Sequence, residues 1–307
     1  KPMTLVELEQ KMSLDNFEGN LYKKLFNLIK ENLEEITNSK PDVSKNSSGY
    51  YLWNVWDGQT FDINKLLVGS QGTLGIVTEI KFRLVPVKAK SKLFVIFLPN
   101  LEHLSQLVKE ILPFKPESLE SYDDNTMKLA IKFLPSMIKT MKVHNFFRLL
   151  FGFFPEVGMI LSGGIPKLIL LVEFSDNDEK EIDKKMLALQ NKIAHFGLKT
   201  RLSRSEEESS KYWTIRRESF NLLRHHIKGA RTAPFVDDVI VKPEFLPEFL
   251  PKMKKILDDY KLVYTMAGHA GNGNFHIIPL MDMKDPNNAK IIPEISNKIY
   301  DLVLSHH

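Results

Sequence analysis

The segment LVYTMAGHAGNGNFHIIPL, residues 262–280, consists of two apolar runs separated by a glycine-rich reversal over residues 270–275. Glycine adopts positive φ at no steric cost, so Gly271 and Gly273 permit a tight turn. We therefore expect a β-hairpin. His269 and His276 lie on its two shoulders, and their rings converge if both strands turn them to the same side. Spacing alone leaves two interpretations open: a metal or catalytic site, or hairpin histidines bonded to nearby backbone.

Outward from the hairpin, apolar runs alternate with amphipathic stretches back to about residue 91. Such runs predict strands and helices by their different periods. The expected strands are 91–99, 166–177 and 234–243; the expected helices are 100–114, 178–197, 206–226 and 244–260; residues 116–134 predict a strand or turn that leads into a helix. Strand–helix–strand units that end in a hairpin favour the α+β class, here a mixed-sheet α/β sandwich.

The first third of the chain has a different pattern. Residues 19–37 carry apolar positions at helical spacing and predict an amphipathic helix. Residues 66–68 and 75–87 predict strands, with Pro86 closing the second one. We place the domain boundary there, which gives domains of residues 1–88 and 89–307.

Composition is that of a globular protein and excludes several classes of site. The 307 residues are 43% hydrophobic and 26% charged, with a net charge of +4. No basic run interleaves with aromatic residues, so a nucleic-acid partner is not expected. The chain has no cysteine, which excludes disulfides, thiolate metal sites and a cysteine nucleophile within it. It starts at Lys1 and stops in a helical pattern, and we expect a fragment of a longer protein.

A second glycine motif, LLVGSQGTLGIVTE, follows an expected strand. Gly69, Gly72 and Gly75 recur every third residue, so successive backbone N–H groups can point at ligand oxygens. The motif matches neither the dinucleotide fingerprint nor the P-loop. On composition alone, a tight turn and a cofactor loop are equally good interpretations.

Two neighbouring arginines lie in the expected helix 206–226. Arg216 and Arg217 point to adjacent faces, so one of them is expected to point inward. A guanidinium fork matches the two oxygens of a substrate carboxylate. The alternative is two surface charges. Asp237 and Asp238 lie in the expected strand at 234–243. For Asp238 two interpretations are equally good: it contacts a ligand directly, or it orients a neighbour or caps a turn.

The segment GYYLWNVWDGQTFDINKLLVGSQGTLGIVTEIKFRLVP resembles the second half of the flavin-binding domain of the vanillyl-alcohol-oxidase and p-cresol-methylhydroxylase type. YWTIRRESF, PFVDDVIVKPEFLPEFL and GHAGNGNFH resemble the C-terminal domain of FAD-linked oxidases, the group of glycolate and D-lactate dehydrogenases. The resemblance covers residues 20–307. It implies that residues 1–88 are the C-terminal part of a flavin-binding α+β domain, and that residues 89–307 form the substrate domain, truncated at its end. Gln71 and Asn272 stand where the family usually has Glu and Asp, which we interpret as tuning.

The resemblance also implies site residues. The cofactor is FAD, and the residues expected against it are Gly69, Ser70, Gly72, Thr73, Leu74, Gly75 and Ile76. His269, His276 and Arg216 are the expected catalytic residues, and Arg216 and Asn274 the expected substrate-binding ones. His269 and His276 are expected to hold a divalent ion (Zn, Mn or Fe), with a third ligand from a GEHG stretch beyond residue 307.

The implied reaction is oxidation of a small 2-hydroxy acid, of the D-lactate or glycolate type, to the 2-oxo acid by hydride transfer to flavin N5. Electrons would pass on to a quinone, a cytochrome or an iron–sulfur protein. The alternative is a non-catalytic flavin-fold module for binding or assembly. We expect a cytoplasmic protein. Five phenylalanines in residues 143–161 indicate either a buried helix or a peripheral contact at the inner face of a membrane.

Overall fold

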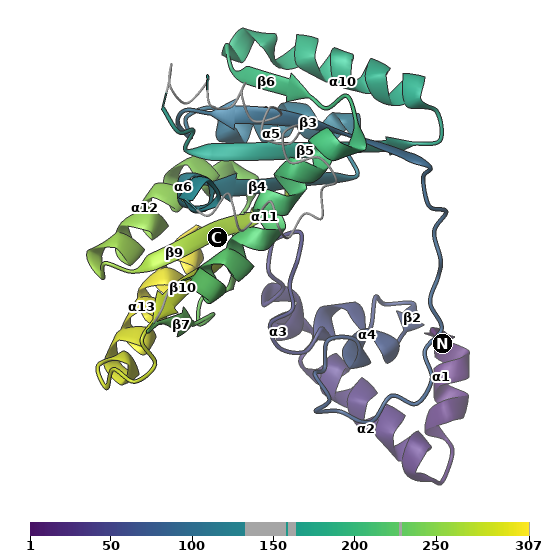
Figure 1. Ribbon diagram of the computed structural model, residues 1–307. Helices are drawn as coiled ribbons and strands as arrows, with labels where there is room; N and C mark the ends of the chain where they lie inside the picture. The colour runs from purple at the N-terminus through teal and green to yellow at the C-terminus, as the bar shows by residue number, and fades with distance from the viewer. Residues whose placement is uncertain (133–157, 159–163, 227–228, 307) are drawn as a thin grey trace. The chain divides into compact units, whose positions relative to one another are not determined.

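The computed structural model describes residues 1–132, 158, 164–226 and 229–306 (Figure 1). The chain divides into two compact units, residues 1–85 and 86–307. The division lies three residues before the boundary expected from the sequence. That the first unit is half of a flavin-binding domain stays a prediction.

The first unit is a small helical cluster around one hydrophobic core. Its helices are α1 (Leu5–Met12), α2 (Phe17–Glu31), α3 (Leu33–Asn38) and α4 (Asn64–Leu67), and a short antiparallel pair joins β1 (Met3–Thr4) to β2 (Thr60–Phe61). Leu8, Val55 and Phe61 are fully buried between them. The helix expected at 19–37 is present in two pieces, because Asn32 interrupts it and its side-chain amide donates to the Leu28 carbonyl.

Both strands expected in this unit were wrong. Residues 64–67 form helix α4, and residues 75–88 have no regular secondary structure. The apolar side chains that suggested a strand are exposed, including Ile76 at 93% and Leu84 at 87%. A strand needs a neighbour for its backbone hydrogen bonds, and no described strand pairs with residues 75–88. The tight turn expected between the two runs is present, with Gly69 and Gly72 at positive φ.

The second unit is built on an eight-stranded sheet (Figure 1). Its strands are β3 (Lys90–Leu98), β4 (Ser118–Asp123), β5 (Leu168–Asp176), β6 (Lys199–Leu202), β7 (Arg231–Thr232), β8 (Asp238–Ile240), β9 (Val263–His269) and β10 (Asn274–Met281). The order is β6-β3-β5-β4-β9-β10-β7, and β8 also pairs with β10. Each pairing described is antiparallel. β3 and β4 follow each other in the chain with a helix between them, but β5 lies between them in the sheet. β5 runs antiparallel to both, so this strand–helix–strand unit is split and its two strands are not adjacent.

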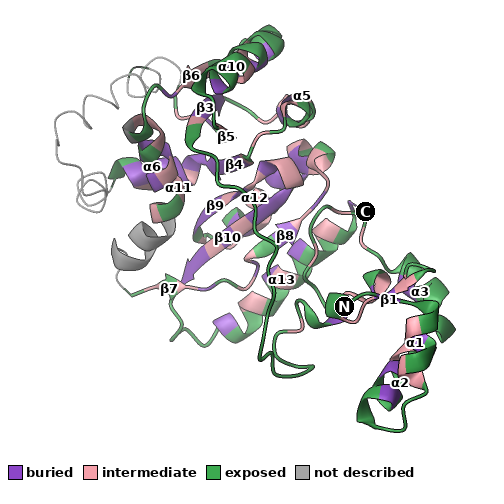
Figure 2. Cartoon of the chain, turned by 90° about the vertical axis from the view of Figure 1, so that its right-hand side faces the viewer, coloured by how far each residue is buried: buried purple, intermediate pink, exposed green. Residues whose placement is uncertain are grey.

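Helices cover both faces of this sheet. They are α5 (Leu104–Ile111), α6 (Asp124–Lys132), α10 (Glu179–Ile193), α11 (Glu206–His226), α12 (Leu246–Asp259) and α13 (Asn288–Leu304). α5, α10, α12 and α13 share one core with one sheet face, and α6 and α11 share a second core with the other. Figure 2 shows the buried strands between them. The α+β class is confirmed, but the sheet is antiparallel in every described pairing and not mixed as expected.

The two cores follow from the pleat of the central strands. Along β3, Phe94 and Ile96 point into the first core, whereas Leu93 and Val95 point into the second. Successive side chains of a strand alternate between faces, so a strand covered on both sides is apolar throughout. The residues of the candidate site lie on the face that α11 covers.

Candidate functional site

The hairpin places both histidines on one face. β9 pairs with β10 so that His269 is opposite Asn274, and His276 is opposite Ala267. Residues two apart on a strand share a face, and so His269 and His276 are diagonal neighbours. Their ring centroids are 5.4 Å apart with planes at 83°. The expected convergence is therefore present in the structure, although His276 is inside β10 and not at its end.

The hairpin turn depends on a glycine in a crowded position. The reversal is a 3-10 turn over Ala270–Asn272, followed by Gly273 at φ +74°. A Cβ added at Gly273 would lie 1.8 Å from the Val241 carbonyl oxygen. Gly273 therefore serves both the turn and a close backbone contact.

A carboxylate that the sequence analysis did not single out completes the cluster. Ser121 pairs with Gly268 across β4 and β9, and this register brings Glu120 beside His269. Nδ1 of His269 lies 2.6 Å from Glu120 Oε1. The Glu120 residue is only 8% exposed. A carboxylate in so little water requires hydrogen-bond partners, and the His269 ring supplies one.

Helix α11 supplies the other partners. Arg216 donates to Glu120 Oε2 from Nε at 3.1 Å and from Nη2 at 2.9 Å. The Arg216 side chain is 20% exposed. Arg217, the next residue, is exposed, and no hydrogen bond or ion pair joins it to any part of the chain that the structure describes. The structure thus gives the two arginines different surroundings, as adjacent positions on a helix predict.

A cavity of about 250 Å³ opens between α11 and the hairpin. Its lining combines two cations, an imidazole, a carboxyl group and three smaller side chains: Arg216, Arg217, Asp237, Thr265, Ala267, His276 and Ile278. Ligand pockets for drug-sized molecules start at about 300 Å³. The size of the cavity and its two guanidinium groups therefore suit a small organic acid.

The two aspartates have different surroundings. Asp237 lines the cavity, with Oδ1 4.0 Å from His276 Nδ1. Burial raises the pKa of Asp237; the charge of His276 lowers it and that of Asp238 raises it. Asp238 accepts a hydrogen bond from the side-chain amide of Asn274 at 2.5 Å, and this amide also donates to the Val239 carbonyl. Asp238 thus orients a neighbour.

Asn274 does not line the cavity. Its side-chain amide nitrogen donates instead to Asp238 and Val239 of strand β8. Its expected contact with substrate stays a prediction.

The glycine turn at residues 69–75 belongs to the first unit. Gly69 and Gly72 have φ of +83° and +77°, and a Cβ built at Gly69, Gly72 or Gly75 meets nothing within 4 Å. The turn closes through the Thr73 amide, which donates to the Ser70 carbonyl at 3.0 Å. The outer side of this backbone is thus open enough for a planar ring to lie against it, as the flavin interpretation requires. The contacts of Leu74 and Ile76 with FAD stay predictions.

The metal interpretation has less support. Within the described residues, no group of three or more histidine, aspartate or glutamate side chains is arranged to hold an ion. Protein zinc sites usually supply three or four ligands. His269 and His276 alone do not meet this number, and the metal site stays a prediction.

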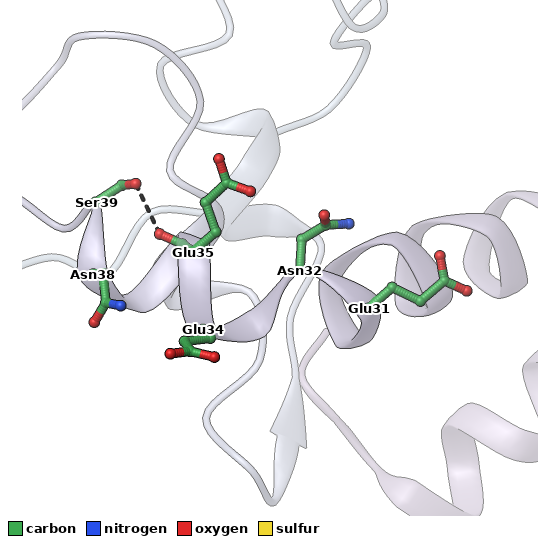
Figure 3. Close-up of a pocket in the computed structure, with 6 residues that line it drawn as sticks. All are labelled: Glu31, Asn32, Glu34, Glu35, Asn38 and Ser39. Carbon is green, nitrogen blue, oxygen red and sulfur yellow. Dashed lines mark hydrogen bonds between the residues drawn. The ribbon is translucent and has the colours of Figure 1, made fainter.

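The hollow at the junction of α2 and α3 is lined by Glu31, Asn32, Glu34, Glu35, Asn38 and Ser39. Figure 3 shows that Glu34 and Glu35 point away from each other, so the carboxylates do not converge on one ligand. The phenylalanine-rich segment 143–161 lies outside the described residues, apart from Gly158. No described helix has the length and apolar character needed to cross a membrane.

Comparison with known proteins identifies the second unit. The family model for FAD linked oxidases, C-terminal domain, matches residues 87–307. Over 303 residues, the chain is 28% identical to a D-2-hydroxyglutarate dehydrogenase of Pseudomonas putida; the match covers 97% of this chain and 29% of the relative. A D-lactate dehydrogenase of Anaerostipes hadrus is 24% identical, with 87% and 50% covered. A glycolate oxidase subunit of Bacillus subtilis is also 24% identical, with 78% and 46% covered.

Among solved structures, alkyldihydroxyacetonephosphate synthase superposes with a TM-score of 0.53 at 16% identity, covering 79% of this chain and 44% of that one. This likeness concerns the fold. The chain spans half or less of the length of the relatives named here.

Proposed function

The chain belongs to the FAD linked oxidases, C-terminal domain family, and from this membership we propose that it forms part of an FAD-dependent dehydrogenase for a small 2-hydroxy acid. The observation that carries the proposal is the cavity between α11 and the hairpin, where Arg216, Arg217 and His276 meet. Three relatives that bear names of 2-hydroxy-acid enzymes support it.

Arg216 is proposed to bind the carboxylate next to the hydroxyl group of the substrate. A guanidinium fork pairs with two carboxylate oxygens, and this geometry also orients the carbon that carries the hydroxyl group. Glu120 balances the charge of Arg216 from behind, whereas Arg217 has no described ion-pair partner. The side chain of Arg216 is thus held in place by Glu120, whereas that of Arg217 is free to adjust to a ligand.

His276 is proposed to take the hydroxyl proton. Its ring lines the cavity, and two carboxyl groups lie behind it at 4.0 Å (Asp237) and 3.8 Å (Asp238) from Nδ1. A general base must be positioned at the substrate, and the place of His276 in the cavity lining supports this role. FAD, when bound, supplies the acceptor for the hydride from the α-carbon. The electrons are proposed to leave for a quinone, a cytochrome or an iron–sulfur protein.

The substrate class has two candidates. D-lactate and glycolate carry one carboxylate, and D-2-hydroxyglutarate carries two. The second guanidinium in the cavity favours an acid with two carboxylates, because Arg217 then pairs with the distal one.

Product binding tests the site without turnover. Calorimetric titration of the chain with 2-oxoglutarate and pyruvate should give saturable binding of at least one of them, and Arg216→Met should weaken it at least tenfold. Unchanged affinity in this variant would remove the cavity as the acid site. The alternative, a non-catalytic flavin-fold module, predicts no binding of either acid and no flavin absorbance in the purified protein.

A further inference from the structure

The side chain of Glu120 joins helix α11 to the histidine pair. Its two oxygens are divided: Oε2 accepts from Arg216, and Oε1 lies 2.6 Å from Nδ1 of His269. We propose that Glu120 is a positioning residue that fixes the tautomer of His269 and couples this ring to Arg216.

The tautomer follows from the hydrogen-bond chemistry. A carboxylate only accepts hydrogen bonds, so the short contact requires the proton on His269 Nδ1. In a neutral imidazole the lone pair is then on Nε2. Second-layer carboxylates orient functional imidazoles in the same manner in many proteins. Glu120 thereby decides which His269 nitrogen is available to a ligand.

The coupling follows from the packing. The Glu120 side chain is 11% exposed, compared with 31% for His269. Its backbone is held by the pairing of β4 with β9, where Ser121 Oγ also donates to the Gly268 carbonyl at 3.1 Å. An anion that pairs with Arg216 would therefore act, through the shared carboxylate of Glu120, on the ring of His269. This coupling to substrate rests on the proposed function, whereas the tautomer does not.

Glu120→Gln is the informative variant because it preserves size. Arginine only donates, so the new amide must turn its oxygen to Arg216 and its NH₂ group to His269. The ring must then accept at Nδ1, and its proton must move to Nε2. Glu173→Gln, on the neighbouring strand β5, is the matched control: this carboxylate accepts from the hydroxyls of Ser91 and Ser118.

The measurement is the pair of ¹⁵N chemical shifts of His269 in the full chain, labelled at histidine and recorded at mildly alkaline pH. His269→Gln assigns the signal. We expect the Nδ1–H form in the wild type, in Glu173→Gln and in Arg216→Met, and the Nε2–H form in Glu120→Gln. An Nε2–H ring in the wild type overturns the proposal directly, even if the Glu120 variant does not fold. So does an unchanged tautomer in Glu120→Gln.

Kinetics of the FAD-loaded protein test the coupling. Glu120→Gln should raise KM at least tenfold, because it weakens the support of Arg216. It should also lower kcat at least tenfold, because it moves the proton of His269, which is expected from the sequence to be catalytic. A change in KM alone would overturn the coupling to His269. Absence of turnover in the wild type would refute the proposed function, and the NMR result on Glu120 would still be valid.

Discussion

Replacement of Gly273 by alanine tests the hairpin geometry that places His269 beside His276. Gly273 has φ +74°, and a Cβ there would lie 1.8 Å from the Val241 carbonyl oxygen and 3.2 Å from the Pro243 nitrogen. A left-handed conformation costs a non-glycine residue about 1–2 kcal/mol. Displacing packed backbone costs about 1–3 kcal/mol more. Together, Gly273→Ala should destabilise the second unit by about 2–5 kcal/mol.

Gly197→Ala separates these two contributions. Gly197 has φ +64° in the same unit, but a Cβ there meets nothing within 4 Å. Both variants also lose the same backbone freedom in the unfolded chain, so this effect cancels between them. The remaining difference of about 1–3 kcal/mol measures the contact with Val241.

Urea and thermal denaturation of the two variants provide the assay. For a unit of this size, 1 kcal/mol shifts the Tm by about 2–4 °C. Gly273→Ala should therefore unfold about 2–12 °C below Gly197→Ala. Equal stabilities would show that the turn does not approach β8, and the reasoning about the hairpin would be refuted.

Four other outcomes follow from the site and its surroundings. Arg217→Met should lower kcat/KM for D-2-hydroxyglutarate about tenfold or more, because a charged hydrogen bond contributes about 1.5–3 kcal/mol, with little effect on D-lactate; equal losses would argue against a second carboxylate. Gly72→Val should remove FAD from a protein whose circular dichroism is unchanged, and full flavin content would contradict the cofactor turn. His269→Ala should reduce zinc uptake measured by calorimetry, and wild-type uptake would exclude His269 as a ligand. Asp123 is fully buried, and burial raises its pKa to about 6, against hydrogen bonds from Thr126 that lower it. The folded state therefore holds a proton that the unfolded chain has already released, so the free energy of unfolding should fall by about 2 kcal/mol as pH rises from 4 to 7. Urea titrations of Asp123→Asn should lack this fall.

The sequence predicted the hairpin and its histidines because both depend on local rules. Alternation fixes which residues share a face, and Gly273 marks the reversal. The strands at 91–99 and 166–177 could also be predicted from the sequence, since continuous apolar runs are typical of strands in a sheet covered on both faces.

Contacts between residues that are far apart in the sequence could not be predicted from local patterns. Glu120 is 149 positions before His269 in the chain, and only the register of β4 on β9 brings them together. Asp237 was considered with Asp238, but the sequence did not show that Asp237 lines the cavity while Asp238 holds Asn274. The strand expected at 75–87 was wrong because apolar and polar residues alternate there without a neighbouring strand to pair with. The alternation is a local pattern, and it does not show whether a pairing partner exists.

The most direct test of the proposed function is anaerobic reduction of the bound flavin. The FAD-loaded protein is mixed separately with D-lactate, glycolate and D-2-hydroxyglutarate, and the absorbance of oxidised flavin is followed. We predict that at least one acid bleaches the flavin, and that Arg216→Met requires at least a tenfold higher concentration of that acid for the same rate. Flavin that stays oxidised with all three acids, or a variant that is reduced as readily as the wild type, would contradict the assignment of this cavity to a 2-hydroxy acid.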